Sequence, residues 1–355
     1  MRTLSFIIGL LAVAYLVSTP ANANQLDASQ PTARDLAVPR YTHIFIIVEE
    51  NKNDAQIIGS LNAPVITGLA HAYGEATDFF AETHPSEPNY VALVGGYTYG
   101  LRDDDAFYCK PDDLRPGCAG SRKSGFVDHT ISAPNLSTQL HDAGLTWKNY
   151  NESIPKAGSL AVSTPLYASK HSGFINFANV QRDPHRAQHL VGFQPFYADL
   201  RDGEVPNFSL IIPNICDDMH GSNIRTLPAD CRYEPVAPLV RRGDRHVMAI
   251  VEAIMASRVW LEKSNDAIVI TWDEDDGGSR AGCCGSDPAD FSNRGGGHVA
   301  TIVITNHGPR RVRDATPYNH YSLLRTIDDA FGIYHYLERA NAPGVVPMLP
   351  LFHVR

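Results

Sequence analysis

Four short apolar runs recur along the chain, and each of them meets polar residues abruptly. They occupy residues 43–48, 208–212, 267–272 and 299–305, and they are rich in Ile and Val without polar alternation. Continuous runs of this kind are typical of strands that are buried on both faces of a parallel sheet. The pattern therefore predicts four strands at the centre of a mostly parallel sheet.

Helical periodicity lies between and after these runs. Alternation of strands and helices predicts an α/β fold, in which helices cover both faces of the sheet. In such folds ligands collect outside the carboxyl ends of the strands. The apolar positions that define two of the helices are Val247, Ile250, Val251 and Ile254, and Leu323, Leu324, Ile327, Ala330 and Phe331.

Residues 98–185 interrupt this alternation. The segment is rich in Tyr, Pro, Ser, Asp and Gly. We interpret it as a long excursion from the sheet that forms a cap over the site, inserted into one domain that spans residues 24–355. The chain shows no internal repeat and no low-complexity tract.

The first residues have the pattern of a secretory signal. Arg2 supplies a positive charge, residues 4–17 are apolar, and residues 21–23 read Ala-Asn-Ala, a typical cleavage site. The alternative is a membrane anchor, which needs about twenty apolar residues. We therefore expect residues 1–23 to be removed on export to the periplasm or the medium, and we expect no stable membrane insertion.

Composition narrows the classes of partner. The formal net charge is −9, and the acidic residues are spread along the chain. The basic cluster at residues 241–245 fits the first turn of a solvated helix rather than a stripe that binds nucleic acid. Nucleic acid is therefore not expected as a partner, whereas a small-molecule or lipid phosphate ester could be drawn in by a local metal ion. No feature specifies an oligomeric state.

Six cysteines fit disulfide formation in an exported protein. They are Cys109, Cys118, Cys216, Cys231, Cys283 and Cys284. We expect the first to pair with the second and the third with the fourth, because each pair flanks an irregular loop. The last two are adjacent, so a vicinal disulfide ring and two reduced thiols are both open. A metal–thiolate site is disfavoured because the chain has no CxxC pair.

Carboxylates follow the apolar runs. Glu50 and Asn51 follow the first run, and Asp273 and Glu274 follow the third. Together they offer three carboxylates and an amide oxygen, which are ligands that a hard divalent cation prefers. These four residues form the candidate metal site. A solvated acidic turn is the alternative for residues 273–276.

Two histidines lie beside the same runs. His220 follows the second run and His298 precedes the fourth, each with an adjacent glycine that allows the backbone to approach a ligand. Each could bind a metal, hold phosphate oxygens or protonate a leaving alkoxide. The alternative for each is an ordinary polar loop residue. His320, which precedes the last helix, is interpreted as structural.

Ser86 is the candidate nucleophile. It precedes Pro88 and the apolar residues 91–94, which indicates a position at a helix N-terminus. Free N–H groups and the positive dipole end there would receive a phosphate oxygen. The alternative is an ordinary N-cap serine. A nearby metal, which would lower the pKa of the hydroxyl, favours the interpretation of Ser86 as a nucleophile. The chain contains no G-x-S-x-G elbow and no phosphate-binding P-loop.

Six segments together resemble the bacterial and fungal phosphoesterase family that contains acid phosphatases and phospholipase-C-like enzymes. Each segment is short, but all six occur in the order of the family and extend over nearly the whole mature chain. They are residues 48–51 (VEEN), 84–90 (HPSEPNY), 212–214 (IPN), 218–220 (DMH), 271–276 (TWDEDD) and 318–326 (YNHYSLLRT).

The resemblance implies an alkaline-phosphatase-like core in which Ser86 is transiently phosphorylated. It also places His298 near the position of a C-terminal site histidine. Two-metal enzymes of the wider superfamily often have Asp-His where this chain has Asp273-Glu274. Because of this difference the presence of a second metal is left open, and Asp218 and His220 are expected to contact the phosphate instead. The metal ligands that the resemblance implies are Glu50, Asn51, Asp273 and Glu274.

Site and resemblance together predict an exported phosphomonoesterase of the acid-phosphatase type that depends on a divalent ion, which could be Ca²⁺, Zn²⁺, Mn²⁺ or Mg²⁺. The alternatives are a phospholipase-C-like phosphodiesterase and an exported binding protein that keeps the fold without turnover. A sulfatase is disfavoured, because Tyr90 stands where the C/S-x-P-x-R motif of those enzymes has arginine.

Overall fold

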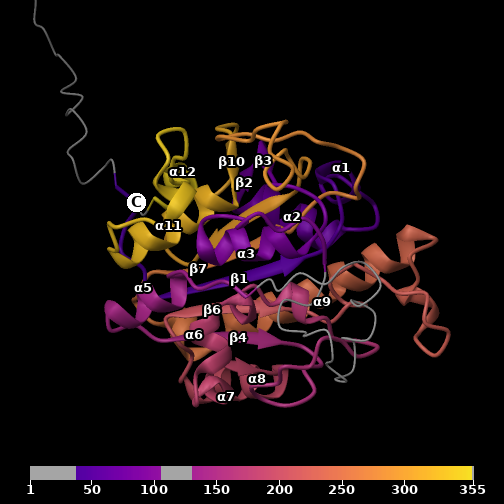
Figure 1. Cartoon of the computed structure of the whole chain (residues 1–355), viewed down its shortest axis with the longest axis horizontal. Helices are drawn as coiled ribbons and strands as arrows, with labels where there is room; N and C mark the ends of the chain where they lie inside the picture. The colour runs from indigo at the N-terminus through magenta and orange to yellow at the C-terminus, as the bar shows by residue number, and fades with distance from the viewer. Residues whose placement is uncertain (1–36, 105–129, 354–355) are drawn as a thin grey trace, which may run out of the picture. The chain divides into compact units, whose positions relative to one another are not determined.

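The computed structural model describes residues 37–104 and 130–353 (Figure 1). The four apolar runs form four strands at the centre of the sheet, as predicted. Every residue of three of these strands is buried, which explains why their sequences lack polar alternation. The four strands are β1 (His43–Glu49), β6 (Phe208–Ile212), β7 (Asp266–Trp272) and β8 (Thr301–Thr305).

The main sheet has eight strands in the order β5-β4-β6-β1-β7-β8-β2-β9. Five neighbours, from β5 to β7, are parallel, whereas β8 runs antiparallel to both β7 and β2. The predicted mixed, mostly parallel sheet is thus confirmed. The outer strands are β2 (Gly74–Ala76), β4 (Trp147–Asn151), β5 (Leu190–Val191) and β9 (Val312–Asp314), and a separate pair is β3 (Phe79–Phe80) with β10 (Tyr318–Asn319).

Strand register brings the acidic segments together. Strands β1 and β7 pair over seven residues, and the last pair is Glu49 with Trp272. Glu50 and Asp273 therefore leave the sheet side by side. Strand β8 is antiparallel, so its amino end lies at the edge where the parallel strands have their carboxyl ends. This edge is where ligands of open α/β sheets bind.

Helices pack on the sheet in two groups. Helix α3 (Glu87–Gly95) packs against α11 (His320–Phe331), in front of the sheet in Figure 1. Helices α2 (Pro64–Ala72), α8 (Phe193–Asp202) and α10 (Arg258–Leu261) pack against the long α9 (Val236–Ala256). All the apolar positions that predicted α9 and α11 are buried.

Short helices complete the described chain. The α-helices are α1 (Asp54–Ile57), α5 (Leu136–Asp142), α6 (Ala178–Arg182), α7 (Arg186–His189) and α12 (Leu349–Phe352). The 3₁₀ turns are Ser169–His171, Phe174–Asn176, Ala229–Cys231 and Glu338–Asn341.

The interpretation of residues 98–185 as an excursion from the sheet needs correction. Strand β4 belongs to this segment and lies between β5 and β6 in the main sheet. Strand β4 carries polar residues such as Lys148 and Asn149, so it has no apolar run that would predict a strand. The part of the predicted cap at residues 105–129 lies outside the described residues.

Two of the cysteine predictions can be compared with the structure. Cys216 and Cys231 form a disulfide as predicted, and Cys283 and Cys284 form a vicinal disulfide, one of the two states left open. The predicted pair Cys109–Cys118 lies outside the described residues, as does the signal at residues 1–23. Within residues 37–104 and 130–353, no helix combines the length and apolarity needed to cross a bilayer.

Asp328 in α11 gives the fold a pH-dependent weakness. Its side chain is fully buried, Oδ1 has no hydrogen-bond partner among the described residues, and Oδ2 accepts one from Gln139 at 3.4 Å. Burial raises the pKa of this carboxyl well above its usual range. The folded state therefore holds the proton at a pH where the unfolded state has lost it, so stability falls as pH rises above the unfolded pKa.

Replacing Asp328 with asparagine is expected to raise the free energy of unfolding at pH 8 by about 1–3 kcal/mol, because a neutral amide needs no buried charge. Urea unfolding at pH 5 and pH 8 measures the effect, which should be smaller at pH 5. The control is Asp202→Asn, on the exposed end of α8. An equal change at both pH values would contradict the explanation.

Candidate functional site

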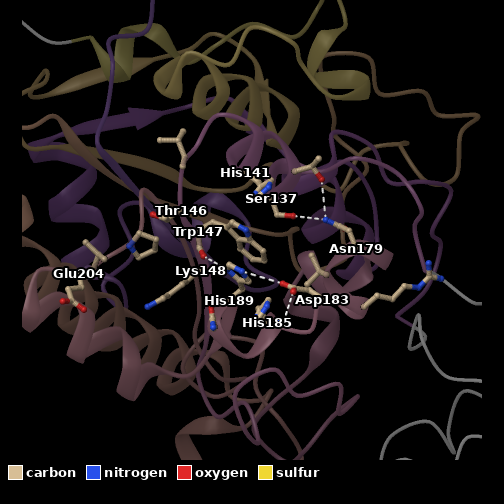
Figure 2. A pocket seen from close by; sticks show the side chains of 17 residues that line it. Ser137, His141, Thr146, Trp147, Lys148, Asn179, Asp183, His185, His189 and Glu204 are labelled. Carbon is tan, nitrogen blue, oxygen red and sulfur yellow. Dashed lines mark hydrogen bonds and ion pairs between the residues drawn. The ribbon is translucent and has the colours of Figure 1, made fainter.

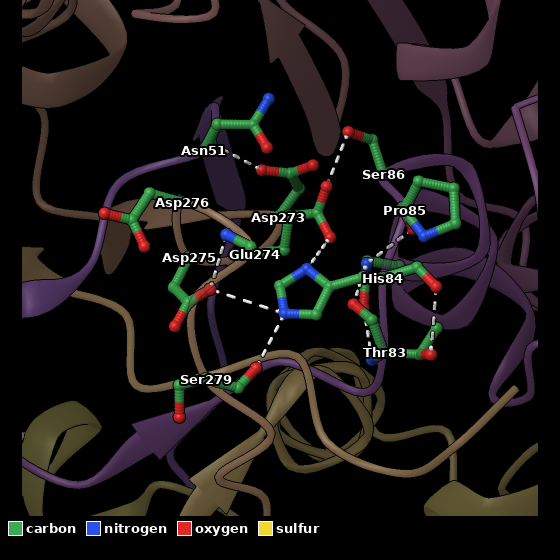
Figure 3. A network of polar contacts seen from close by, with 12 residues as sticks. Asn51, Thr83, His84, Pro85, Ser86, Asp273, Glu274, Asp275, Asp276 and Ser279 are labelled. Atoms are coloured by element: carbon green, nitrogen blue, oxygen red, sulfur yellow. Dashed lines mark hydrogen bonds and ion pairs between the residues drawn. The ribbon is translucent and has the colours of Figure 1, made fainter. Parts of the chain in front are cut away.

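The ends of β1 and β7 deliver the four predicted metal ligands to one place. The N–H of Asn51 donates to Oδ1 of Asp273 at 3.0 Å (Figure 3), and the side-chain amide of Asn51 donates to Glu50. Asn51 has a positive φ of 55°, a conformation that asparagine tolerates better than most residues. This turn carries the chain away from the sheet while the side chains stay at its edge.

Ser86 lies at the N-terminus of α3 and points at these carboxylates. Its hydroxyl donates to Oε1 of Glu274 at 3.0 Å and lies 3.3 Å from Oε2 of Glu50. It makes no capping hydrogen bond to its own helix, and only 2% of the residue is exposed. The structure thus does not support an ordinary N-cap serine, because the hydroxyl faces the acidic cluster instead of the helix.

The helix N-terminus itself is partly occupied. The N–H of Glu87 donates to Asp104 at 3.0 Å, and Pro88 has no N–H. Asp104 also forms an ion pair with Lys170 at 2.7 Å. The predicted role of free N–H groups in phosphate binding therefore stays a prediction, and Lys170 adds a positive charge near the helix start.

His84 orients Glu274 from the side opposite Ser86. Its Nδ1 bonds the second carboxylate oxygen of Glu274, and its Nε2 lies 2.8 Å from the Ser279 carbonyl and 3.3 Å from Asp275 (Figure 3). Burial alone would lower the pKa of His84, but the hydrogen bond and charge of Glu274 raise it. Glu274 is thus held between an imidazole and the Ser86 hydroxyl.

His171 links Glu50 to Asp218. Its Nε2 lies 2.8 Å from Glu50 and its Nδ1 lies 3.3 Å from Asp218, while its ring stacks on Tyr90 at 5.2 Å. Burial opposes protonation of His171, but the charge of Glu50 and the hydrogen bonds to Asp218 and Glu50 together raise its pKa to about 9. This favours a protonated imidazole next to Glu50 at neutral pH.

Asp218 and His220, predicted to contact phosphate, lie at the same cluster. The His220 N–H donates to Asp218 at 2.7 Å, and the His220 ring lies 5.5 Å from that of His171. One donor atom each from Glu50, His171 and His220 lies within 4.8 Å of the others. The structure therefore presents a second possible set of metal ligands that shares Glu50 with the predicted set.

His298 lies apart from these contacts. Its Nε2 is 2.8 Å from the Thr77 carbonyl, and its ring lies 5.3 Å from that of Phe80. No described contact joins it to Ser86, so its catalytic role stays a prediction. The preceding glycines approach protein rather than ligand, because a Cβ at Gly297 would lie 2.1 Å from the Asp275 carboxylate.

The residues fit a divalent cation. Oδ2 of Asp273 is buried without a hydrogen-bond partner in the described part of the chain. Burial raises the pKa of Asp273 well above its usual range, and the charges of Glu50 and Glu274 raise it further. Like carboxylates this close need either protons or a cation, and oxygen donors are what a hard cation prefers.

Other polar groups of the same motifs are structural. His320 is buried between Glu82 and the Trp272 carbonyl, in agreement with its structural interpretation. Asn89 bonds the backbone of residues 82, 83 and 85, which fixes the turn that presents Ser86.

Lys52 ties together the two loops that carry the site. It is 5% exposed, and its ammonium donates to the carbonyls of Asn51 at 2.9 Å and Met219 at 2.8 Å. Burial lowers the pKa of Lys52, and the charges of Glu50 and Asp218 oppose that shift. This lysine holds the turn after β1 against the loop after β6.

Lys52→Met is expected to lower kcat/KM about 10- to 100-fold, because both loops lose their common anchor. The loss of stability should be about 1–3 kcal/mol from the unsatisfied carbonyls. Phosphate-ester turnover well below the melting temperature measures the first effect, with Lys52→Arg as the partial rescue. Lys148→Met, which removes an ion pair with Asp199, is the matched control. Equal activity of the two methionine variants would contradict the anchoring role.

Sequence reasoning missed His84, Lys52 and His171. The first two stand within two residues of predicted site residues, so closeness to Ser86 and Asn51 was an available signal. His171 lies in a 3₁₀ turn, Ser169–His171, with no apolar run before it. The local sequence carries no signal that separates His171 from other histidines of the segment.

A hollow of about 860 Å³ lies elsewhere, around the start of β4 and helix α7 (Figure 2). None of its lining residues belongs to the Ser86 cluster. Its Trp147 stacks on His189, with the ring centroids 4.5 Å apart, and lies 4.5 Å from the ring of Phe174. The hollow and the Ser86 cluster are thus separate features of the described chain.

Comparisons with known proteins agree with this geometry. A profile described as "Phosphoesterase family" matches residues 60–334. The chain is 31% identical over 347 residues to a "Phosphatidylinositol-3-phosphatase" of Mycobacterium tuberculosis, covering 96% of this chain and 91% of the relative. It is 25% identical over 355 residues to a "Phosphate-repressible acid phosphatase" of Penicillium chrysogenum, covering 94% and 71%.

Among solved structures, a protein in the alkaline phosphatase superfamily from Vibrio parahaemolyticus has the same fold. The TM-score is 0.51 at 13% sequence identity, and the match covers 84% of this chain and 69% of the other. This likeness confirms the predicted fold class.

Proposed function

Because the chain belongs to the Phosphoesterase family and is a hydrolase of phosphoric esters, we propose that it is an exported, metal-dependent phosphomonoesterase. In this proposal Ser86 is the nucleophile. The observation that carries the proposal is the hydroxyl of Ser86, which bonds Glu274 at 3.0 Å and lies 3.3 Å from Glu50. A buried serine that faces carboxylates instead of capping its helix supports this proposal.

Four side chains would hold the cation. A divalent ion held there would polarise the phosphoryl group and lower the pKa of a nearby hydroxyl. The protein contributes oxygen donors from the ends of two adjacent strands, with Asp273 offering an oxygen that has no described partner. The proposed ligands are Glu50, Asn51, Asp273 and Glu274.

Proton movement at Ser86 follows from its hydrogen bond. The Ser86 hydroxyl donates to Glu274, so the proton leaves toward this carboxylate as the oxygen attacks phosphorus. Burial raises the pKa of Glu274 while the hydrogen bond of His84 opposes it. The bond from phosphorus to the leaving oxygen breaks as the Ser86–phosphorus bond forms. A water molecule then attacks phosphorus, the Ser86–phosphorus bond breaks, and inorganic phosphate is released while the proton on Glu274 returns to the Ser86 oxygen.

Positive charge for the transferred phosphoryl group comes from His171. Its pKa of about 9 keeps the imidazole protonated at neutral pH, and the pKa of nearby Lys170 is raised by the charge of Asp104 despite burial. Charges fixed in a site without reorganisation are a main source of rate in phosphoryl transfer. His220 beside His171 is the proposed donor of a proton to the leaving alkoxide, or a phosphate ligand together with Asp218.

The relatives bear on the substrate class. Their names describe removal of phosphate from a phosphatidylinositol 3-phosphate and general acid phosphatase activity. We therefore propose a phosphate monoester, soluble or on a lipid headgroup, as the substrate. The proposal of export depends on the leader pattern of residues 1–23 and on the Cys216–Cys231 disulfide, which suits an oxidising compartment.

The test is turnover of three esters by the purified mature chain. p-Nitrophenyl phosphate, bis-p-nitrophenyl phosphate and a short-chain phosphatidylinositol 3-phosphate are assayed before and after chelation, with Ca²⁺, Zn²⁺, Mn²⁺ or Mg²⁺ added back. We expect monoester hydrolysis that chelation abolishes and one metal restores. Preference for the diester would make the protein a phosphodiesterase, and activity unchanged by chelation would refute metal dependence.

A further inference from the structure

A second cluster of possible ligands lies away from the Ser86 cluster. Glu152 follows β4, Asp217 lies in the loop after β6, and His246 lies in α9. One donor atom from each lies within 4.8 Å of the other two, and His246 Nε2 is 3.2 Å from Glu152. Neighbouring strand ends and one helix therefore converge on one point.

A buried carboxylate without a partner stands at the same cluster. Glu49 is fully buried, and neither of its carboxylate oxygens has a hydrogen-bond partner among the residues that the structure describes. Burial raises its pKa most, and the charges of Asp218, of Asp217 and Glu152, and of Asp244 in α9 raise it further. Successive residues at a strand end point to opposite faces of a sheet. Glu50 faces Ser86, so Glu49 faces the side of α9.

The positive charge at the cluster is shared among several carboxylates. Arg242 bonds Asp217 at 2.7 Å and Asp230 at 3.0 Å. Asn214 donates to Asp217 at 2.7 Å and to Glu152 at 3.0 Å, and Glu152 also pairs with His246. No contact joins Arg242 or His246 to Glu49 in the described part of the chain. A buried carboxylate without a counter-charge is costly unless it holds a proton or a cation. Arg242 therefore leaves the acidic side of the cluster only partly balanced.

We propose that Glu152, Asp217 and His246 bind a divalent cation at a second site, with the Glu49 carboxylate as its buried counter-charge. Two carboxylates and an imidazole are the donors that Zn²⁺ and Mn²⁺ accept more readily than Ca²⁺ does. His246 is oriented for this role by Phe193, on which it stacks at 5.9 Å with ring planes 6° apart. The site is distinct from the proposed reaction centre, because it shares no ligand with it.

The second site would fix the loop that serves the first. Asp217 is followed directly by Asp218, which contacts His171 and accepts the N–H of His220. A cation that joins Asp217 to β4 and α9 would restrain this loop between two rigid elements. Its role is therefore positional, and it takes no part in bond breaking.

Metal counting on the full mature chain tests the proposal. The protein is loaded with Mn²⁺ or Zn²⁺, freed of excess by gel filtration and analysed by mass spectrometry. We expect two equivalents per chain in the wild type and one in Glu152→Gln/His246→Asn. Glu50→Gln should also lose one equivalent, but the one at the reaction centre. Loss in Glu50→Gln alone would support the proposed function and overturn the second site, and loss in the double variant alone would do the reverse.

The matched control is Asp183→Asn/His189→Asn. It removes another acid–histidine pair, whose side chains lie 3.7 Å apart and line the hollow of Figure 2. It should keep both equivalents. If the double variant fails to fold, His246→Gln serves instead, because its amide can still donate to Glu152. The cation should raise the melting temperature of Glu50→Gln but not of Glu50→Gln/His246→Gln. Equal metal content and equal thermal response in variant and wild type would overturn the proposal.

Discussion

Ser86→Ala is expected to reduce kcat by about four orders of magnitude or more, to the level at which only binding and electrostatics remain. The reason is that Ser86 is the proposed nucleophile, and its hydroxyl faces both Glu50 and Glu274. Removing one buried oxygen that caps nothing should leave the fold intact. Initial rates on p-nitrophenyl phosphate measure the effect, and circular dichroism with thermal unfolding checks the fold.

Two further measurements separate a lost nucleophile from a disturbed site. Wild-type protein quenched in acid during turnover of a ³²P-labelled ester should carry label on the peptide that contains Ser86, and the variant should carry none. Ser209→Ala is the matched control, since Ser209 is a fully buried serine within β6. It should keep full activity. Label retained by Ser86→Ala would place the nucleophile elsewhere.

The second large effect is expected for Glu50→Gln, with a loss of about 100- to 1,000-fold in kcat. Glu50 is fully buried and contacts Ser86 on one side and His171 on the other. Burial would raise its pKa, but the charge and hydrogen bond of His171 lower it, which favours the ionised form. The substitution removes that charge from the proposed metal ligands and leaves His171 with Asp218 as its remaining carboxylate partner.

Rates across a metal titration distinguish the two consequences. If Glu50 holds the cation, the variant should need a higher metal concentration for half-maximal activity. Glu75→Gln is the control, because Glu75 is a buried carboxylate on β2 that pairs with Arg313. It should match the wild type. A Glu50→Gln variant with wild-type kcat and metal dependence would remove Glu50 from the site.

The strands and the main helices could be predicted because burial leaves a local mark on the sequence. A strand covered on both faces is apolar along its centre, as β1 is over residues 44–48 and β7 over residues 267–270, and a helix on the sheet is apolar on one stripe, as α9 is. Strand β4 carries Lys148 and Asn149 and leaves no such mark. The sequence of β4 therefore predicts part of an insertion instead of a strand.

The site was predictable where its residues follow strand ends and not where they arrive by tertiary contact. Glu50 and Asp273 follow paired strands, so sheet topology alone brings them together. His171 reaches Glu50 from an irregular segment, and His84 reaches Glu274 through a turn. Contacts of this kind leave no periodic pattern of apolar residues in the sequence. The two interpretations of Ser86 were separable only by the direction of its hydroxyl.

The Cys216–Cys231 disulfide closes one loop that has an inner and an exposed part. The inner part, residues 217–220, carries Asp218 and His220, and the exposed part is residues 223–226. Closing a flexible loop costs little more when it is lengthened. The exposed part can therefore change in length and sequence while the cross-link keeps the inner part in register with the sheet. Substitutions and insertions at residues 223–226 are expected to leave Asp218 and His220 in place.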